Sequence, residues 1–455
     1  MDDAVNFFGL DYSSEHRRST EMKSSTFSRS LELAKLVAKV GLTELRSGNV
    51  KSRFDQAVLI ANSLSGLKGA AMKAGQLLSL DLDNYFPPEA IEILSQLQNA
   101  AVSHPFAEID AVLTKELSPQ QKAKLKNMSL GPIGVASIAQ VHKAKYDNQD
   151  VVLKVQYPGV ADSIDSDLKI LKTVAVSFCQ LTGRKMNLDP LFQEFRTILN
   201  QEVDYIAEAG FQRLYKEHIE KLNATGPYRY RVPKIIDEMS TQHVLTMGLE
   251  SGSSLRTWVS TKPNADQRQE LACAVLDLYF HEFFQWGLVQ TDPNWGNFLV
   301  DTKDSQLTLV LLDFGATRRY EPEFIKNYIL LLNLAAEKKS AALKEHAIEF
   351  GLIDRRESPA AFKALEVMLS TAIKPFFTKI SGATSFDFSD KNHAVDSQNA
   401  AKSLSDELVY SAPPYKLMFL HRKLAGVYSI LKSLEVKLDI SSYWQKMTDL
   451  SEGNL

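Results

Sequence analysis

Cysteine is scarce in this sequence. Its 455 residues include only Cys179 and Cys273, which are far apart and lie in apolar sequence with helical character. Two isolated thiols exclude a disulfide framework, and no dense cluster of histidine, cysteine and carboxylate residues indicates a zinc site. We therefore expect reduced core thiols in a reducing compartment.

Long apolar runs are absent as well. The apolar segments 174–181 and 329–332 have only the length of core segments, whereas a membrane-spanning helix needs roughly 18 apolar residues. The N-terminal residues 1–8 are acidic and lack the basic-then-apolar pattern of a signal peptide, and they fit a mitochondrial presequence poorly. The pattern predicts a cytoplasmic protein with no signal peptide or transmembrane helix.

The chain has no marked excess of either charge. It contains 52 Lys and Arg residues against 55 Asp and Glu residues, for a net charge of −3. Such a balance gives no indication of nucleic-acid binding, and we expect no nucleic-acid partner. The length is sufficient for two or three lobes or domains with a sizeable core.

Two short motifs in the C-terminal half carry residues with metal and phosphate chemistry. Asp292 and Asn297 are five residues apart, as the aspartate and asparagine of a kinase catalytic loop are, and Asp313 begins an Asp-Phe-Gly one strand-turn-strand interval later. Carboxylate and amide oxygens are the ligands that a Mg-nucleotide site needs. A lone Asp-Phe-Gly would be weak evidence, because such tripeptides occur by chance. The two motifs in this order and at this spacing indicate a nucleotide site.

An apolar strand with one lysine lies upstream of these motifs. The alternation in 151–156 predicts a strand on which Lys154 shares a face with Val152 and Gln156. A lysine within an apolar strand needs an anion, and the candidates are a nucleotide phosphate and a helix glutamate. An edge-strand lysine reaching water is the alternative, and the downstream motifs make it less favoured.

The segment before that strand lies where a kinase has its glycine-rich phosphate loop. It reads Gly134-Val135-Ala136-Ser137 and continues towards a strand at 138–145. Small residues allow backbone N–H groups to approach phosphates, although alanine stiffens the loop. An ordinary hairpin between two strands fits the same residues.

An acidic segment, 194–208, is predicted to form one helix. We favour Glu208 as the partner of Lys154 and assign Glu202 and Asp204 a polar role near the nucleotide, although a solvated helix face remains open. The expected apolar stripe consists of Phe195, Ile198, Leu199 and Ile206.

Taken together, these motifs resemble the UbiB-like atypical kinases, also called the AarF or ADCK family, and most of all the branch that supports coenzyme Q synthesis. The resemblance runs from about residue 59 to about residue 438. Its marks are Lys73-Ala-Gly-Gln76, 134–137, 153–160, Glu202-Val-Asp204 with Glu208, 290–295, 312–318 and 420–426.

This resemblance implies an α+β, protein-kinase-like two-lobed fold with a helical N-terminal extension over the active site. The expected parts are a flexible tail (1–27), the helical extension with Lys73 and Gln76 (28–126), an N-lobe (127–247) and a helical C-lobe (248–455). The segment 385–405 is polar and is predicted to be a loop.

The resemblance also implies roles for individual residues. Asn297 and Asp313 bind Mg²⁺, Lys154 holds phosphates, Asp292 positions the nucleophile, and Lys73 and Gln76 reach into the cleft where a protein substrate would otherwise lie. The nucleotide is ATP or ADP, and Gly134 puts in doubt the ADP preference associated with an alanine there. Other residues expected at the nucleotide are Val135, Ala136, Ser137, Glu202, Asp204 and Met247.

The function that follows is cleavage of the γ-phosphate of Mg-ATP in support of ubiquinone or related prenyl-lipid synthesis. A nucleotide-gated binding module without turnover and a protein kinase remain the alternatives. The implied partners are a prenyl-lipid or phenolic lipid precursor and coenzyme Q biosynthetic proteins. Because such proteins work at membrane surfaces, peripheral contact with the inner membrane is open, with the amphipathic segment 30–42 as candidate, although a helix packed on the domain is slightly favoured.

Overall fold

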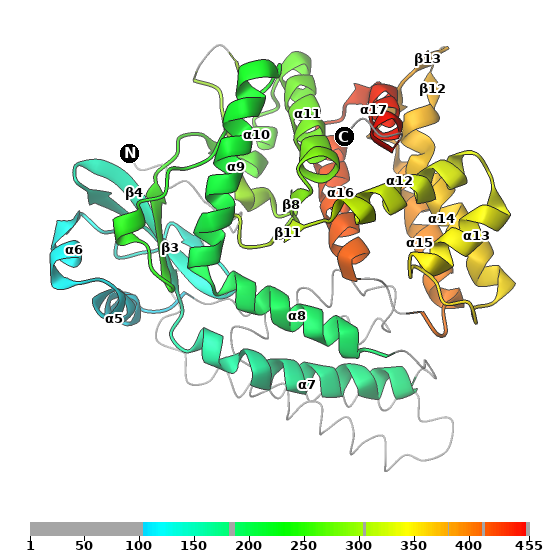
Figure 1. Cartoon of the computed structure of the whole chain (residues 1–455). Coiled ribbons are helices and arrows are strands. Elements are labelled where there is room, and N and C mark those ends of the chain that lie inside the picture. The colour runs from blue at the N-terminus through cyan, green and yellow to red at the C-terminus, as the bar shows by residue number, and fades with distance from the viewer. Residues whose placement is uncertain (1–102, 182–186, 304–305, 381, 412–414, 452–455) are drawn as a thin grey trace. The chain divides into compact units, whose positions relative to one another are not determined.

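The computed structural model describes residues 103–181, 187–303, 306–380, 382–411 and 415–451 (Figure 1). The chain divides into two compact units. Unit 1 comprises the described residues within 1–183, 188–205 and 236–246, and unit 2 those within 184–187, 206–235 and 247–455. Lys73, Gln76, the segment 30–42 and most of the expected helical extension lie outside the described residues. The bounds expected for tail, extension and lobes stay predictions.

A twisted sheet forms the centre of unit 1. Its strand order is β1-β3-β4-β6, and β2 also pairs with β3. The hairpin β3–β4 turns at Asp147 and Asn148, whose φ angles of 43° and 65° suit the two-residue turns that match strand twist. Strand β4 confirms the strand predicted for 151–156. The strands are β1 (Leu125–Lys126), β2 (Gly134–Val135), β3 (Ala139–Tyr146), β4 (Gln149–Gln156) and β6 (Val244–Gly248), the last two residues of β6 belonging to unit 2.

Four helices and a 3₁₀ turn accompany this sheet. Helices α7 and α8 lie side by side (Figure 1). A capping box between Ser118 and Gln121 starts α6, because each residue's side chain bonds the other's backbone N–H. The elements are α5 (Phe106–Glu116), α6 (Pro119–Lys124), α7 (Val160–Leu181), α8 (Asp189–Glu202) and η1 (Asp237–Met239).

The prediction of one helix over 194–208 was wrong. Helix α8 ends at Glu202, and α9 (Tyr205–Thr225) begins three residues later. Val203 lies at the break, and its carbonyl accepts a hydrogen bond from the buried side-chain amide of Gln156 at 2.6 Å. Of the predicted apolar stripe, the three α8 residues are buried, but Ile206, which lies on α9 after the break, is 61% exposed.

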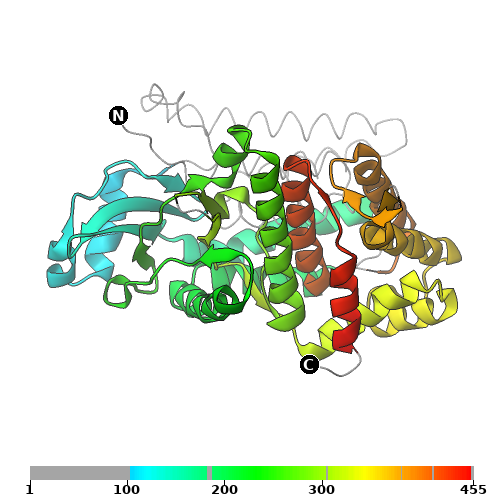
Figure 2. The same cartoon turned by 90° about the horizontal axis from the view of Figure 1, so that it is seen from above.

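Unit 2 contains a four-stranded sheet of order β5-β10-β9-β7 and a separate ladder of β8 and β11. Its helices include α11 and α16, which lie beside each other (Figure 2). The strands are β5 (Arg229–Arg231), β7 (Ser253–Ser254), β8 (Leu288–Gln290), β9 (Phe298–Asp301), β10 (Thr308–Leu311), β11 (Thr317–Arg319), β12 (Lys379–Ile380), β13 (Ala383–Thr384), β14 (Phe386–Asp387) and β15 (Lys437–Leu438). The helices after α9 are α10 (Leu255–Ser260), α11 (Ala265–Phe280), the π-helix η2 (His281–Gln285), the 3₁₀ helix η3 (Trp295–Asn297), α12 (Pro322–Ala336), α13 (Ser340–Glu349), α14 (Pro359–Phe377), α15 (Lys391–Glu407), α16 (Tyr415–Ser433) and α17 (Ser441–Ser451). Among the described residues, no helix combines the length and the apolar character needed to cross a membrane.

The prediction of a loop at 385–405 was also wrong, because most of that segment is α15. The side chain of Asp390 caps the helix by accepting a hydrogen bond from the Asn392 N–H at 2.9 Å. Ala400 and Leu404, four residues apart, are buried, and the helix packs along α14. Two apolar positions one turn apart suffice to hold a largely polar helix on its neighbour.

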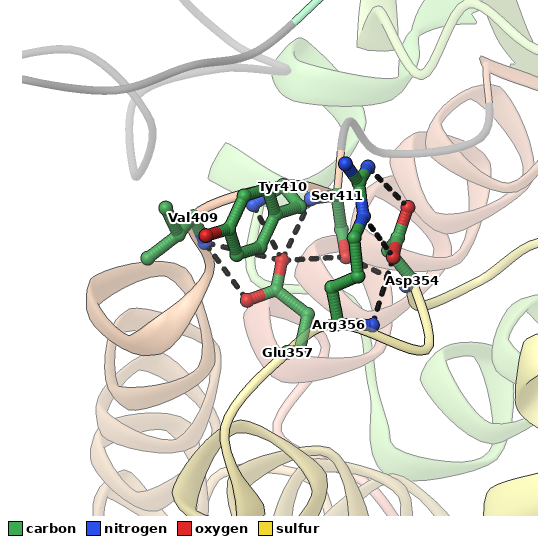
Figure 3. Close-up of polar contacts among 6 residues, drawn as sticks. All are labelled: Asp354, Arg356, Glu357, Val409, Tyr410 and Ser411. Atoms are coloured by element: carbon green, nitrogen blue, oxygen red, sulfur yellow. Dashed lines mark hydrogen bonds and ion pairs between the residues drawn. The ribbon is translucent and has the colours of Figure 1, made fainter.

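One loop of unit 2 is organised around a buried carboxylate (Figure 3). Glu357 accepts hydrogen bonds from the backbone N–H groups of Val409, Tyr410 and Ser411 and from the Ser411 hydroxyl, at 2.7–3.1 Å. Burial by itself would raise the pKa of Glu357, but these hydrogen bonds outweigh it and the pKa is lowered. The ionised side chain therefore fixes the turn after α15.

Candidate active site

A β-hairpin in unit 2 brings the two expected magnesium ligands to neighbouring positions. Strands β9 and β10 are antiparallel, and Phe298 pairs with Leu311. Asn297 directly precedes the first of these residues, and Asp313 follows the second by two positions. The Leu312 N–H donates to the Asn297 carbonyl at 3.0 Å and extends the ladder to the site.

A second ladder ties the segment of Asp292 to the Asp-Phe-Gly motif. Strands β8 and β11 pair Gln290 with Thr317. Beyond them, the N–H and the hydroxyl of Thr291 both donate to the carbonyl of Ala316, at 3.2 and 2.8 Å. The two ladders therefore hold the segments that carry Asp292, Asn297 and Asp313 together within unit 2.

Glu208 lies beside the Asp-Phe-Gly turn. It is only 1% exposed. A Cβ placed on Gly315 would lie 3.3 Å from Glu208 Oε2 and 3.4 Å from Asp313 Oδ1, so the two carboxylates are neighbours and the glycine leaves room for both. The Gly315 N–H also donates to Asp313 Oδ1 at 2.9 Å and orients that carboxylate. The pairing of Glu208 with Lys154, which belongs to unit 1, stays a prediction.

Helix α16 contributes a residue for which the motifs predict no role. The Arg422 guanidinium contacts Asp292 Oδ1 at 3.1 Å, and both side chains are nearly buried. Four residues later, Gly426 packs directly against Pro293, because a Cβ at this glycine would lie 2.0 Å from the proline Cβ. The available signal was an adjacent Arg-Lys pair in the middle of a helix whose other residues are mostly apolar.

The neighbouring lysine of α16 forms a second buried ion pair. Lys423 Nζ lies 2.8 Å from Glu282 Oε2. The Tyr215 hydroxyl hydrogen-bonds the other oxygen of Glu282 at 2.8 Å and approaches the Leu288 carbonyl at 3.1 Å, at the start of β8. Burial, followed by the nearby Glu282 charge, raises the pKa of Tyr215 well above its ordinary value, so the hydroxyl keeps its proton.

Asn294 has a structural function in the segment 292–297, which is the expected catalytic loop. Its side chain accepts a hydrogen bond from the Gly296 N–H at 2.9 Å and caps η3, which ends at Asn297. This cap shapes the turn between Asp292 and Asn297. In kinases the residue two positions after the aspartate is a lysine, and here it is Asn294.

Unit 1 carries the expected phosphate-binding lysine. Lys154 lies on β4 and is almost fully buried, on the strand face predicted for it. Its Nζ is 5.1 Å from the centre of the Tyr205 ring, a distance typical of a cation–π contact. An aromatic face stabilises a buried ammonium without neutralising it.

The residues 134–137 form a hairpin within unit 1. Gly134 and Val135 pair with β3, and the Ala136 N–H closes the turn on the Ala139 carbonyl at 2.8 Å. A hairpin was one interpretation of the sequence, and a contact of this turn, Ser137 included, with phosphate stays a prediction.

The remaining expected nucleotide residues are spread over three elements. Glu202 is the last residue of α8, and Asp204 lies in the turn before α9; both are half-buried. Met247 is buried in β6, and its sulfur is 4.0 Å from the Gln212 amide nitrogen. Their contact with a nucleotide also stays a prediction.

The donor set in unit 2 fits a magnesium ion. Asn297 is buried, and no described residue forms a hydrogen bond with its Nδ2. Rotation of the amide by 180° exchanges that nitrogen with the oxygen, so an unpartnered amide is suited to accepting a ligand. The adjacent carboxylates of Asp313 and Glu208 favour a nearby cation. Magnesium commonly takes one or two protein ligands and completes its shell with phosphates and water.

The lysine-bearing sheet of unit 1 and the two ladders of unit 2, with their Asp, Asn and Asp-Phe-Gly, define a protein-kinase-like fold. The chain matches the ABC1 atypical kinase-like domain over residues 96–347, and it belongs to that family. This confirms the family predicted from the motifs.

Named relatives support the same family. The chain is 32% identical over 431 residues to "Atypical kinase COQ8, mitochondrial" of Saccharomyces cerevisiae, covering 90% of this chain and 82% of the relative. It is 31% identical over 393 residues to "Probable serine/threonine-protein kinase abkA" of Dictyostelium discoideum, covering 84% and 68%. A solved structure, the complex of Rv3197 with erythromycin from Mycobacterium tuberculosis, matches with a TM-score of 0.56 at 24% identity, over 86% of this chain and 95% of that one, and supports the fold alone.

Proposed function

We propose that this protein binds Mg-ATP and cleaves its γ-phosphate in support of coenzyme Q or related prenyl-lipid synthesis. The observation that carries the proposal is the pair of ladders that joins the segments of Asp292, Asn297 and Asp313. The names of the COQ8 relatives support the biosynthetic setting, and family membership supports a kinase-type enzyme.

Each site residue has a role in this reaction. Asn297 and Asp313 would hold the Mg²⁺, which would supply neutralisation of developing phosphate charge, and Lys154 would bind the α- and β-phosphates. Asp292 orients the nucleophile, either water or a substrate hydroxyl, towards the γ-phosphorus. The new O–P bond forms as the bond to the β,γ-bridging oxygen breaks, ADP leaves, and the proton of the nucleophile passes to the phosphate product or solvent.

The test is phosphate release from Mg-ATP by the wild type and Asp313→Asn, with and without anionic liposomes that carry a prenyl-phenol. Nucleotide binding is measured separately by calorimetry. Asp396→Asn is the matched control, because it makes the same chemical change at an exposed position of α15 in the same unit. We expect wild-type release that liposomes increase, its loss in Asp313→Asn, and its retention in the control.

The opposite result would identify a different class of protein. Clear nucleotide binding with no phosphate release under any condition would contradict the enzyme and favour a nucleotide-gated binding module. Release that survives in Asp313→Asn would contradict the metal site assigned here.

A further inference from the structure

We infer that Arg422 is a positioning residue that orients the Asp292 carboxylate and places a positive charge beside it for the reaction. The inference rests on the proposed function and adds a residue from a helix far along the chain. Arg422 and Asp292 are 130 residues apart in sequence, and their side chains are 7% and 12% exposed.

The contact between the two residues has the chemistry that such a role needs. The Arg422 Nη2 donates to Asp292 Oδ1 at 3.1 Å, and this charged hydrogen bond restricts rotation of the carboxylate. A guanidinium remains protonated at any pH at which the protein is folded, so it cannot exchange a proton with the nucleophile. Arg422 therefore acts through Asp292.

Helix α16 is held firmly enough to fix the guanidinium. Gly426 allows the helix to touch Pro293, the residue after Asp292. One residue after Arg422, Lys423 pairs with buried Glu282, which Tyr215 connects to the start of β8. The helix thus contacts the catalytic loop directly and is linked to the strand that leads into it.

The catalytic loop provides no cation of its own beside the aspartate. The position two residues after Asp292 is Asn294, and its side chain is occupied in capping η3. An aspartate that orients a hydroxyl accepts a hydrogen bond from it, and an ionised carboxylate makes the stronger bond. Arg422 supplies a positive charge beside the Asp292 carboxylate and restrains it through a charged hydrogen bond.

The experiment compares Arg422→Gln and Arg422→Lys with wild type. Arg231→Gln is the matched control, because it breaks another Arg–Asp pair of unit 2, the 2.7 Å contact with Asp301 at the far end of β9. The measurements are kcat and KM for Mg-ATP, calorimetric nucleotide affinity, thermal unfolding, and hydrogen exchange of the segment 290–297.

We expect Arg422→Gln to lower kcat by roughly 10- to 100-fold, the range typical of a catalytic group misplaced by about 1 Å, with nucleotide affinity within about threefold of wild type. Arg422→Lys restores part of the rate because it restores the charge. Exchange of 290–297 rises at least about tenfold in Arg422→Gln and stays at the wild-type rate in Arg231→Gln.

A double variant separates positioning from folding. Asp292→Asn combined with Arg422→Gln removes both members of the ion pair, and we expect it to be no slower than Asp292→Asn alone. Wild-type kcat in Arg422→Gln, or a full further loss in the double variant, would overturn the inference.

If the proposed function is wrong, the wild type itself releases no phosphate. Hydrogen exchange of the segment 290–297 then still tests whether Arg422 positions Asp292. Unchanged exchange of 290–297 in Arg422→Gln would overturn the inference independently of turnover.

Discussion

Substitution of Gly426 by alanine should damage the catalytic loop more than it damages the fold. The added Cβ would lie 2.0 Å from the Pro293 Cβ and 3.0 Å from its Cα. Carbon atoms in contact are separated by about 3.5–4.0 Å, so α16 and the loop must move apart by roughly 1.5 Å or more. The proline cannot yield by changing rotamer, because its ring is closed on the backbone.

The expected cost follows from two opposing effects. Overpacking costs about 1–3 kcal/mol, and the rigid obstacle favours the upper end of that range. Replacing a glycine within a helix by alanine returns up to about 1 kcal/mol. The free energy of unfolding should therefore fall by about 2 kcal/mol. Since Asp292 immediately precedes Pro293, a displacement of about 1 Å should lower kcat by roughly 100-fold.

The assay pairs phosphate release with urea unfolding. Gly210→Ala is the control, because Gly210 lies within α9 and a Cβ there meets nothing within 4 Å. This control should gain up to about 1 kcal/mol of stability and keep its kcat. Wild-type stability and wild-type kcat in Gly426→Ala would refute the close packing of α16 on the loop.

Three further predictions concern unit 2. Lys423→Met leaves Glu282 buried without its ion-pair partner, so urea unfolding should show a loss of about 3–5 kcal/mol, and a loss below about 1 kcal/mol would contradict the pair. Glu357→Gln replaces an acceptor of three N–H bonds by a neutral amide and should cost about 1–3 kcal/mol by the same measurement, whereas unchanged stability would contradict the arrangement in Figure 3. Burial lowers the pKa of His421 from 6.5 to about 4, so the folded state binds fewer protons than the unfolded state between these values. The resulting stability, up to about 3 kcal/mol, is complete above pH 6.5 and is lost as pH falls towards 4; His421→Asn should flatten this pH dependence, and an unchanged slope would contradict it.

The parts of the site that sequence could predict are those set by local spacing. Alternation around Lys154 was enough to predict β4 and the face that the lysine occupies. The interval between Asn297 and Asp313 has the length of a hairpin, and β9 and β10 form it. In both cases the pattern and the structure depend on residues that are close in sequence.

Features set by distant residues could not be predicted. The break between α8 and α9 depends on Gln156, 47 residues before the carbonyl that it satisfies. Helix α15 depends on packing against α14, because its composition alone is that of a loop. The role inferred for Arg422 depends on its contact with Asp292, which no periodicity or motif spacing in the sequence predicts.

The distance in sequence between Asp292 and Arg422 has a consequence for biogenesis. A ribosome adds about 5–20 residues per second, so the 130 residues between them take roughly 7–26 s to make. During this interval the nascent chain already contains Asn297 and Asp313 but lacks the helix that steadies the catalytic loop. On the proposed function, full turnover of ATP would thus begin only after α16 has been made, and proteolytic removal of α16 would lower turnover while leaving Asn297 and Asp313 in the chain.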